Sequence, residues 1–174
     1  LKIEFEDIRY KYEDWSKMKA TGKFELKALP VLECEPCGMQ LSQSDAIMQK
    51  LGEEYGLIPK DPEEYYNTLW WCETAKDVRD GCWKLYLPLT EEKKAEVIKE
   101  LCEKTATNCF HAMEERLKAN KGEYLVGKGI TIAEFYLVGL YRACLLSENL
   151  KDVKAVMEKY PTLKEFIEKK HKEY

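Results

Sequence analysis

Gln43 and Ser44 lie where a short apolar segment gives way to a helical pattern, and this position favours the capture of a carboxylate. The surrounding segment, residues 28–51, reads ALPVLECEPCGMQLSQSDAIMQKL. Ser42 or Ser44 is predicted to cap the helix, whose apolar residues recur on one face. The unpaired N–H groups and the dipole of a helix N-terminus both attract an anion. The pair is therefore a candidate anion site.

A β-hairpin must position this pair. Residues 29–32 form a branched apolar run, and Pro30 is expected at the start of a strand because proline cannot donate a ladder hydrogen bond. Residues 35–38 have turn chemistry, and residues 39–41 resume the alternation of apolar and polar side chains. The pattern predicts a hairpin that leads directly into the helix.

Cys34 and Cys37 have a spacing that is compatible with thiol–disulfide exchange. A redox pair of this kind needs its first thiolate at a helix N-terminus, whereas both cysteines fall in the predicted hairpin turn, so this hypothesis is the weakest one. The seven cysteines are scattered and odd in number. This usage predicts reduced thiols and a cytoplasmic location.

Composition excludes several classes of protein. A net charge of −4 and a pI near 5.5 argue against nucleic-acid binding. No apolar run approaches the roughly 20 residues that span a bilayer, so a soluble globular protein without a membrane span is expected. The two histidines, His111 and His171, lie far apart, and no metal site is predicted.

The chain is expected to contain two domains. Residues 1–57 form a small mixed α/β unit, residues 58–62 form a linker with two prolines, and residues 63–174 form an all-helical unit. Residues 3–8 alternate in part and predict a half-buried strand, followed by a polar loop from 12 to 26. In the second domain, Thr131 and Glu134 have the spacing of a capping box.

Three segments of the chain resemble the cytosolic glutathione S-transferase family, in particular its sigma-, mu- and pi-like members. They are LPVLE with GMQLSQSDAI, YLVGKGITIAEF, and KYPTLKEF. The resemblance covers the whole chain and implies a thioredoxin-like N-terminal domain, incomplete here, followed by an all-α C-terminal domain. It further implies that the first strand, the first helix and the catalytic residue lie upstream of Leu1. We therefore expect a fragment, and an intact mass equal to 20.4 kDa would contradict this.

The resemblance also implies roles for the residues of the hairpin. Gln43 and Ser44 would hold the γ-glutamyl carboxylate of glutathione. The backbone of Leu29, the residue before Pro30, would pair with the cysteinyl part of the tripeptide. No catalytic residue can be assigned within this chain.

The remaining site residues come from two other segments. Trp15 and Lys19 would grip the glycyl carboxylate, with Lys17 in place of Lys19 if the segment is not helical; otherwise they are a packing aromatic and a solvated charge. Asp77 would reach the α-amino group of glutathione in the partner subunit of a homodimer, with Glu73 as the alternate. An ordinary exposed helix charge is the other interpretation of Asp77.

The implied function is a glutathione transferase that conjugates or isomerises small apolar electrophiles with glutathione as co-substrate and no metal. The long helical pattern of residues 63–86 is rich in aromatic residues, which are expected in the core and at an interface, with residues 81–83 lining the acceptor pocket. The alternative is a non-catalytic binding or structural subunit of a larger assembly. Lys27 stands where the family usually has a small residue, and this departure is compatible with the non-catalytic alternative.

Overall fold

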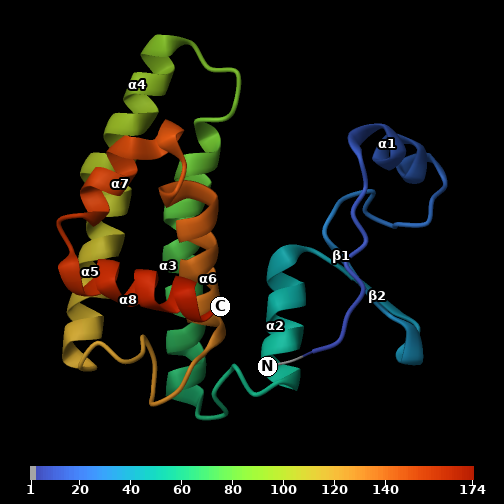
Figure 1. Cartoon of the computed structure of the whole chain (residues 1–174), viewed down its shortest axis with the longest axis horizontal. Coiled ribbons are helices and arrows are strands. Elements are labelled where there is room, and N and C mark those ends of the chain that lie inside the picture. Colours follow the sequence, from blue (N-terminus) through green and yellow to red (C-terminus); the bar gives the residue numbers. More distant parts are fainter. Residues whose placement is uncertain (1–2) are drawn as a thin grey trace. The chain divides into compact units, whose positions relative to one another are not determined.

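The computed structural model describes residues 3–174, which form two compact units (Figure 1). The first unit ends at Leu51, and the second unit runs from Gly52 to Tyr174. Within the described residues, no helix is both long enough and apolar enough to cross a bilayer.

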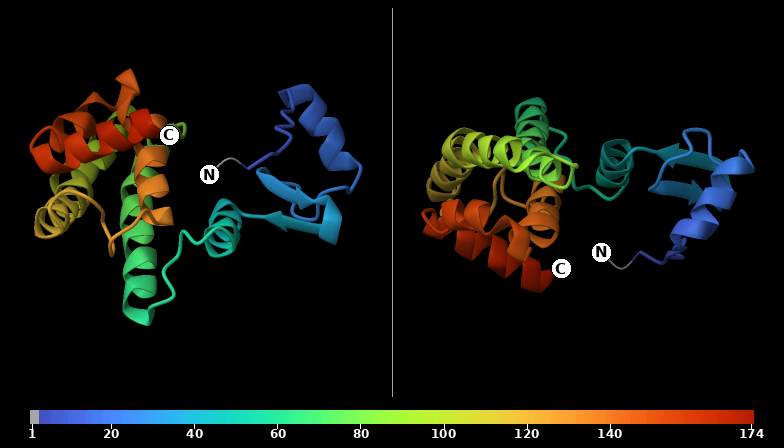
Figure 2. Two further views of the ribbon diagram at one scale, coloured as in Figure 1. Left: turned by 60° about the horizontal axis from the view of Figure 1, so that its bottom comes forward. Right: turned by 90° about the horizontal axis from the view of Figure 1, so that it is seen from above.

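The first unit is built on an antiparallel hairpin. Its elements are α1 (Tyr12–Ala20), β1 (Val31–Cys34), the 3₁₀ turn η1 (Glu35–Cys37), β2 (Met39–Ser42) and the start of α2 (Ser44–Glu54). The two strands lie side by side (Figure 2). Their ladder runs from Val31 opposite Ser42 to Cys34 opposite Met39. Gly38 closes the turn at φ 67°, in the left-handed region that glycine tolerates best. The predicted hairpin and its helix are present.

Two predictions for the N-terminal segment are wrong. The segment 3–8 is not a strand: it makes no ladder in the part of the chain that the structure describes, and the Phe5 side chain is 78% exposed. A strand needs a partner for its backbone groups as well as an alternating pattern, and this segment has none there. The expected loop from residue 12 instead begins with α1. Acidic residues in its first turn and basic residues in its last turn suit the helix dipole.

The second unit is helical throughout its regular elements. These are α3 (Pro62–Lys84), α4 (Glu91–Glu100), the π-helical η2 (Leu101–Ala106), α5 (Thr107–Ala119), α6 (Ile132–Leu140), the π-helical η3 (Tyr141–Leu145), the 3₁₀ turn η4 (Glu148–Leu150), α7 (Lys151–Met157) and α8 (Pro161–Glu173). The start of α3 shows how local chemistry sets a boundary. Pro62 occupies the first turn, and the Asp61 carboxylate accepts hydrogen bonds from the N–H groups of Glu63 and Glu64 at 3.1 and 3.0 Å.

The core of the second unit lies between its helices, with α6 packed along α3 (Figure 1). Its largest fully buried side chains come from six helical elements (α5, α6, η3, η4, α7 and α8) and from the connection that holds Leu125. They are Phe110, Met113, Leu117, Leu125, Ile132, Leu137, Leu140, Leu145, Leu150, Met157, Leu163 and Ile167. Full burial of each such aliphatic or aromatic side chain contributes about 1.5–3 kcal/mol, so this cluster holds the unit together.

Two buried carboxylates organise helix starts in this core. The predicted capping box at Thr131 and Glu134 is confirmed. Glu134 accepts hydrogen bonds from the N–H groups of Thr131 at 2.8 Å and Leu125 at 2.9 Å. Glu114 of α5 accepts a hydrogen bond from the N–H of Leu163 at 2.7 Å. This bond satisfies one of the N–H groups in the first turn of α8 that have no partner within the helix. Both carboxylates are buried and are compensated by these bonds.

Candidate functional site

The open end of the hairpin brings together two of the candidate residues. Val31 and Ser42 form the last pair of the ladder, so Pro30 and Gln43 each stand one residue beyond it on neighbouring strands. The Leu29–Pro30 peptide bond is cis, and Leu29 is exposed. The backbone before Pro30 and the backbone at Gln43 therefore leave the sheet at the same end.

Gln43 connects β2 to α2 in an uncommon backbone conformation. Its φ of 75° lies in the left-handed region, which a non-glycine residue rarely occupies. Its carbonyl accepts the first helical hydrogen bond, from the N–H of Ile47 at 3.0 Å. Gln43 itself therefore holds the N-cap position, and the prediction that Ser42 or Ser44 caps the helix is wrong. Gln43 and Ser44 are both exposed, beside the first N–H groups of α2.

Trp15 and Lys19 lie one turn apart on α1. The Lys19 ammonium is 5.9 Å from the centroid of the Trp15 ring, a cation–π contact that requires the helix. The Trp15 ring also packs at 5.7 Å from Phe24, which is buried, and at 5.9 Å from Tyr10. Lys17 instead pairs with Asp14. The helical conformation thus favours Lys19 over Lys17 as the partner of Trp15, whose ring is also a packing aromatic.

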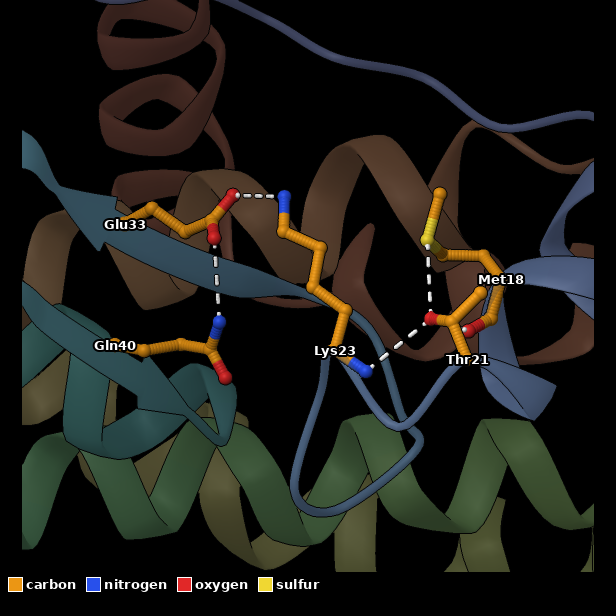
Figure 3. A network of polar contacts seen from close by, with 5 residues as sticks. All are labelled: Met18, Thr21, Lys23, Glu33 and Gln40. Carbon is orange, nitrogen blue, oxygen red and sulfur yellow. Dashed lines mark hydrogen bonds and ion pairs between the residues drawn. The ribbon is translucent and has the colours of Figure 1, made fainter.

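A polar network ties α1 to the hairpin (Figure 3). The Thr21 hydroxyl donates to the carbonyl of Met18, near the end of α1, at 2.7 Å and accepts from the N–H of Lys23 at 3.2 Å. The Lys23 ammonium then pairs with Glu33 of β1 at 3.0 Å. Gln40 of β2 donates its amide to the other Glu33 oxygen at 3.2 Å. The network connects the segment that carries Trp15 to the strands that lead to Gln43.

Electrostatics strengthen this link. The hydrogen bond from Lys23 lowers the pKa of the Glu33 carboxyl, and the same bond raises the pKa of Lys23. Three members of the network, Lys23, Glu33 and Gln40, were not among the residues predicted from the sequence. The register of the hairpin carried a signal for two of them, because Glu33 and Gln40 are directly opposite in the ladder.

The other candidates belong to the second unit. Asp77 is exposed on α3, and Glu73, one turn earlier, pairs with Lys76 at 2.8 Å. Tyr66 and Trp70 are also exposed on α3, at 69% and 61%. The spacing of four residues places these two aromatic side chains next to each other on one side of the helix.

Comparison with known proteins fits this arrangement. The family model described as the glutathione S-transferase C-terminal domain matches residues 76–173. Glutathione S-transferase 1 of Ascaris suum is 32% identical over 78% of this chain and 65% of its own length. Glutathione S-transferase P 10 of Caenorhabditis elegans is 30% identical over 96% of this chain and 74% of its own length. The chain therefore belongs to the glutathione S-transferase family, and these matches span about two thirds to three quarters of those relatives.

A solved structure extends the likeness to the fold. The prostaglandin synthase D of Nilaparvata lugens matches with a TM-score of 0.70 and 26% identity, over 96% of this chain and 85% of that one. The predicted fold class, a thioredoxin-like N-terminal domain with a helical C-terminal domain, is confirmed. The prediction of a glutathione transferase is confirmed at the level of the family, whose members are enzymes. The roles of the individual site residues stay predictions.

Proposed function

We propose that the first unit binds glutathione at the open end of the hairpin. The observation that carries the proposal is the pairing of Val31 with Ser42, which sends Pro30 and Gln43 out of the sheet side by side. The left-handed backbone at Gln43 supports the same idea, because strained conformations persist where the surrounding structure holds them and are frequent at ligand sites. The γ-glutamyl carboxylate would lie at the start of α2, beside Gln43 and Ser44.

The opposite end of the tripeptide, its glycyl carboxylate, would bind to α1. An indole N–H beside an ammonium group suits a carboxylate, and Trp15 and Lys19 are in contact on that helix. The Lys23–Glu33 ion pair would hold this helix at a constant distance from the hairpin. The backbone of Leu29 would pair with the cysteinyl part of glutathione, in an extended arrangement like that of a strand added to a sheet edge.

The reaction that we propose is addition of the glutathione thiol to a small apolar electrophile. The residues named here would bind and orient the tripeptide, which converts an encounter of two molecules into a reaction within one complex. Isomerisation of a prostaglandin-type substrate is the second candidate, and the likeness to the Nilaparvata lugens prostaglandin synthase supports it. A cytoplasmic location would fit the seven cysteines, because no disulfide joins any of them in the described part of the chain.

We also propose a homodimer that uses α3. Tyr66 and Trp70 present two large aromatic side chains on the surface of that helix, and aromatic residues are enriched at protein interfaces. Asp77 lies further along the same helix and is exposed. In a two-fold dimer, its carboxylate would face the α-amino group of glutathione bound to the partner subunit.

Retention on immobilised glutathione tests the binding site, and turnover of a chlorodinitrobenzene-type electrophile tests the activity. Gln43→Ala should weaken retention without unfolding the unit. Gln43→Gly is the sharper variant, because glycine accepts the left-handed backbone and removes only the side chain. Glu25→Gln, at an exposed loop position, is the control.

Retention that falls in both Gln43 variants, at unchanged melting temperature, would support the site. Retention equal to that of the wild type and of Glu25→Gln would refute it. If the protein binds glutathione but turns over neither class of substrate, the proposed enzymatic function is wrong and the non-catalytic binding alternative takes its place.

A further inference from the structure

Cys34 and Cys37 form a close pair of thiols at the closed end of the hairpin. Cys34 ends β1 and Cys37 ends η1, and the two Sγ atoms are 2.7 Å apart. Both cysteines are free; Cys37 is exposed and Cys34 is half-buried. The single 3₁₀ turn of η1 lies between them and brings positions i and i+3 onto the same side of the chain, which places the two sulfur atoms together.

The surroundings give the two thiols different reactivity. The hydrogen bond between the two thiols lowers the pKa of Cys37, and further contributions come from the N–H of Met39 and the charge of Lys50. The same thiol–thiol bond raises the pKa of Cys34. The expectation from the sequence was that a redox pair needs its first cysteine activated by a helix dipole. The structure instead activates the second cysteine, by a neighbouring thiol and a backbone donor.

We propose that Cys34 and Cys37 are a reversible dithiol–disulfide pair that exchanges with small disulfides, with glutathione disulfide as the oxidant. The Cys37 thiolate attacks one sulfur of glutathione disulfide, forms a mixed disulfide and expels a glutathione thiolate, which takes up a proton. Cys34 then loses its proton to solvent, attacks the Cys37 sulfur and expels the second glutathione thiolate. The protein dithiol loses two electrons, and one glutathione disulfide becomes two glutathione molecules.

The other cysteines are less accessible to a small disulfide. Cys82 and Cys144 form a second hydrogen-bonded pair of thiols, and that bond lowers the pKa of Cys144, but both side chains are buried. Burial raises the pKa of Cys109 to about 11 and also raises the pKa of Cys102. Cys72 is buried as well. Because the thiolate is the reactive form, the exposed Cys37 should be the preferred point of attack in the described part of the chain.

The test is oxidation of the reduced protein by glutathione disulfide, followed by alkylation with iodoacetamide, intact mass and peptide mapping. In the wild type we expect protection of Cys34 and Cys37 together, with a mass lower by two hydrogen atoms and no retained glutathione. Cys34→Ser should stop at a glutathione adduct on Cys37. Cys37→Ser cannot form the internal disulfide, and its half-buried Cys34 should form an adduct more slowly than the exposed Cys37 does in Cys34→Ser. In the reduced wild type, Cys37 should be alkylated on the order of a hundredfold faster than Cys109.

Cys109→Ser is the matched control and should oxidise like the wild type. The proposal fails if the wild type accumulates a stable glutathione adduct instead of the internal disulfide. It fails equally if Cys34→Ser and Cys37→Ser form adducts at the same rate. Because these readouts follow sulfur chemistry at the closed end of the hairpin, they are independent of glutathione retention at Gln43 and extend beyond the proposed function.

Discussion

Glu33 of β1 and Lys23 of the preceding loop form an ion pair at 3.0 Å, although they are ten positions apart in the chain. Gln40, directly opposite Glu33 in the ladder, binds the other carboxylate oxygen. Both strands of the hairpin thereby hold the loop that follows α1. The contacts act on the position of α1, and so they link the two proposed ends of the glutathione site.

Lys23→Met should lower glutathione affinity severalfold with little loss of stability. The side chains of Lys23 and Glu33 are 45% and 39% exposed, and an exposed ion pair contributes less than about 1 kcal/mol. The loosened loop should nevertheless let α1 move away from the hairpin. Calorimetric titration with glutathione and urea unfolding measure the two effects. Arg9→Met, which removes another exposed ion pair at 2.8 Å, is the control; equal affinities in both variants would contradict the anchoring role.

Trp15→Phe separates the two interpretations of Trp15. Phenylalanine keeps an aromatic ring against the buried Phe24 but lacks the indole N–H donor. If the donor binds the glycyl carboxylate, affinity should fall about five- to thirtyfold, the equivalent of about 1–2 kcal/mol. Tyr12→Phe, at an exposed position on the same helix, should change nothing. An unchanged dissociation constant for Trp15→Phe would assign Trp15 to packing alone.

Local chemistry explains which parts of the fold could be predicted. Pro30 and Gly38 limit the backbone at the edges of the hairpin, and the order of residues 39–51 marks a strand followed by a helix. The capping box at Thr131 and Glu134 needs only residues three positions apart. Such signals are contained within a few neighbouring residues, and the structure has these elements where the patterns indicated.

The errors depend on contacts between distant residues. The segment 3–8 alternates like a strand, but pairing is decided by a neighbouring strand and not by its own pattern. The helix α1 buries none of its residues, so it has no apolar stripe that a periodic pattern could reveal. Lys23 and Glu33 could not be paired before the loop geometry was known. The hairpin turn, predicted only as turn chemistry, contains the 3₁₀ turn η1 and so brings Cys34 and Cys37 together.

Glu134→Ala should destabilise the second unit by about 3 kcal/mol. The substitution leaves the buried N–H groups of Thr131 and Leu125 without an acceptor, and each unsatisfied buried donor costs about 1–3 kcal/mol. Glu134→Asp should retain most of the stability, because its carboxylate keeps the capping chemistry. Urea unfolding measures the difference, with Glu123→Ala at an exposed position as the control. A loss no larger than the control's would refute the role of Glu134.

Replacement of Tyr66 and Trp70 by serine should convert the proposed dimer to a monomer. Both side chains are exposed on α3, so the substitution should leave the fold of one subunit intact. Analytical ultracentrifugation gives the mass in solution, and circular dichroism checks the helices. Tyr12→Ser, also exposed, is the control and should remain dimeric. A wild type that sediments as a monomer at all concentrations would contradict the dimer directly.

Glu114→Gln should cost about 1–2 kcal/mol near neutral pH and progressively less in acid. Burial alone would raise the pKa of the Glu114 carboxyl, but hydrogen bonds from the N–H of Leu163 and from Thr162, with the Lys118 ammonium, outweigh it and lower the pKa. A lowered folded-state pKa means that the carboxylate stabilises the fold above its ordinary pKa of about 4.3. That contribution is lost as the pH falls through the folded-state value.

Urea unfolding of the wild type and of Glu114→Gln measures this effect. The difference between their free energies of unfolding should be larger at about pH 7 than at about pH 3. Glu115→Gln is the matched control, since Glu115 also pairs with Lys118, at 3.0 Å, but its side chain is 55% exposed. Its effect should stay below about 0.5 kcal/mol at both pH values. A difference for Glu114→Gln that does not shrink in acid would mean that shape, and not the charge at the start of α8, accounts for the stabilisation.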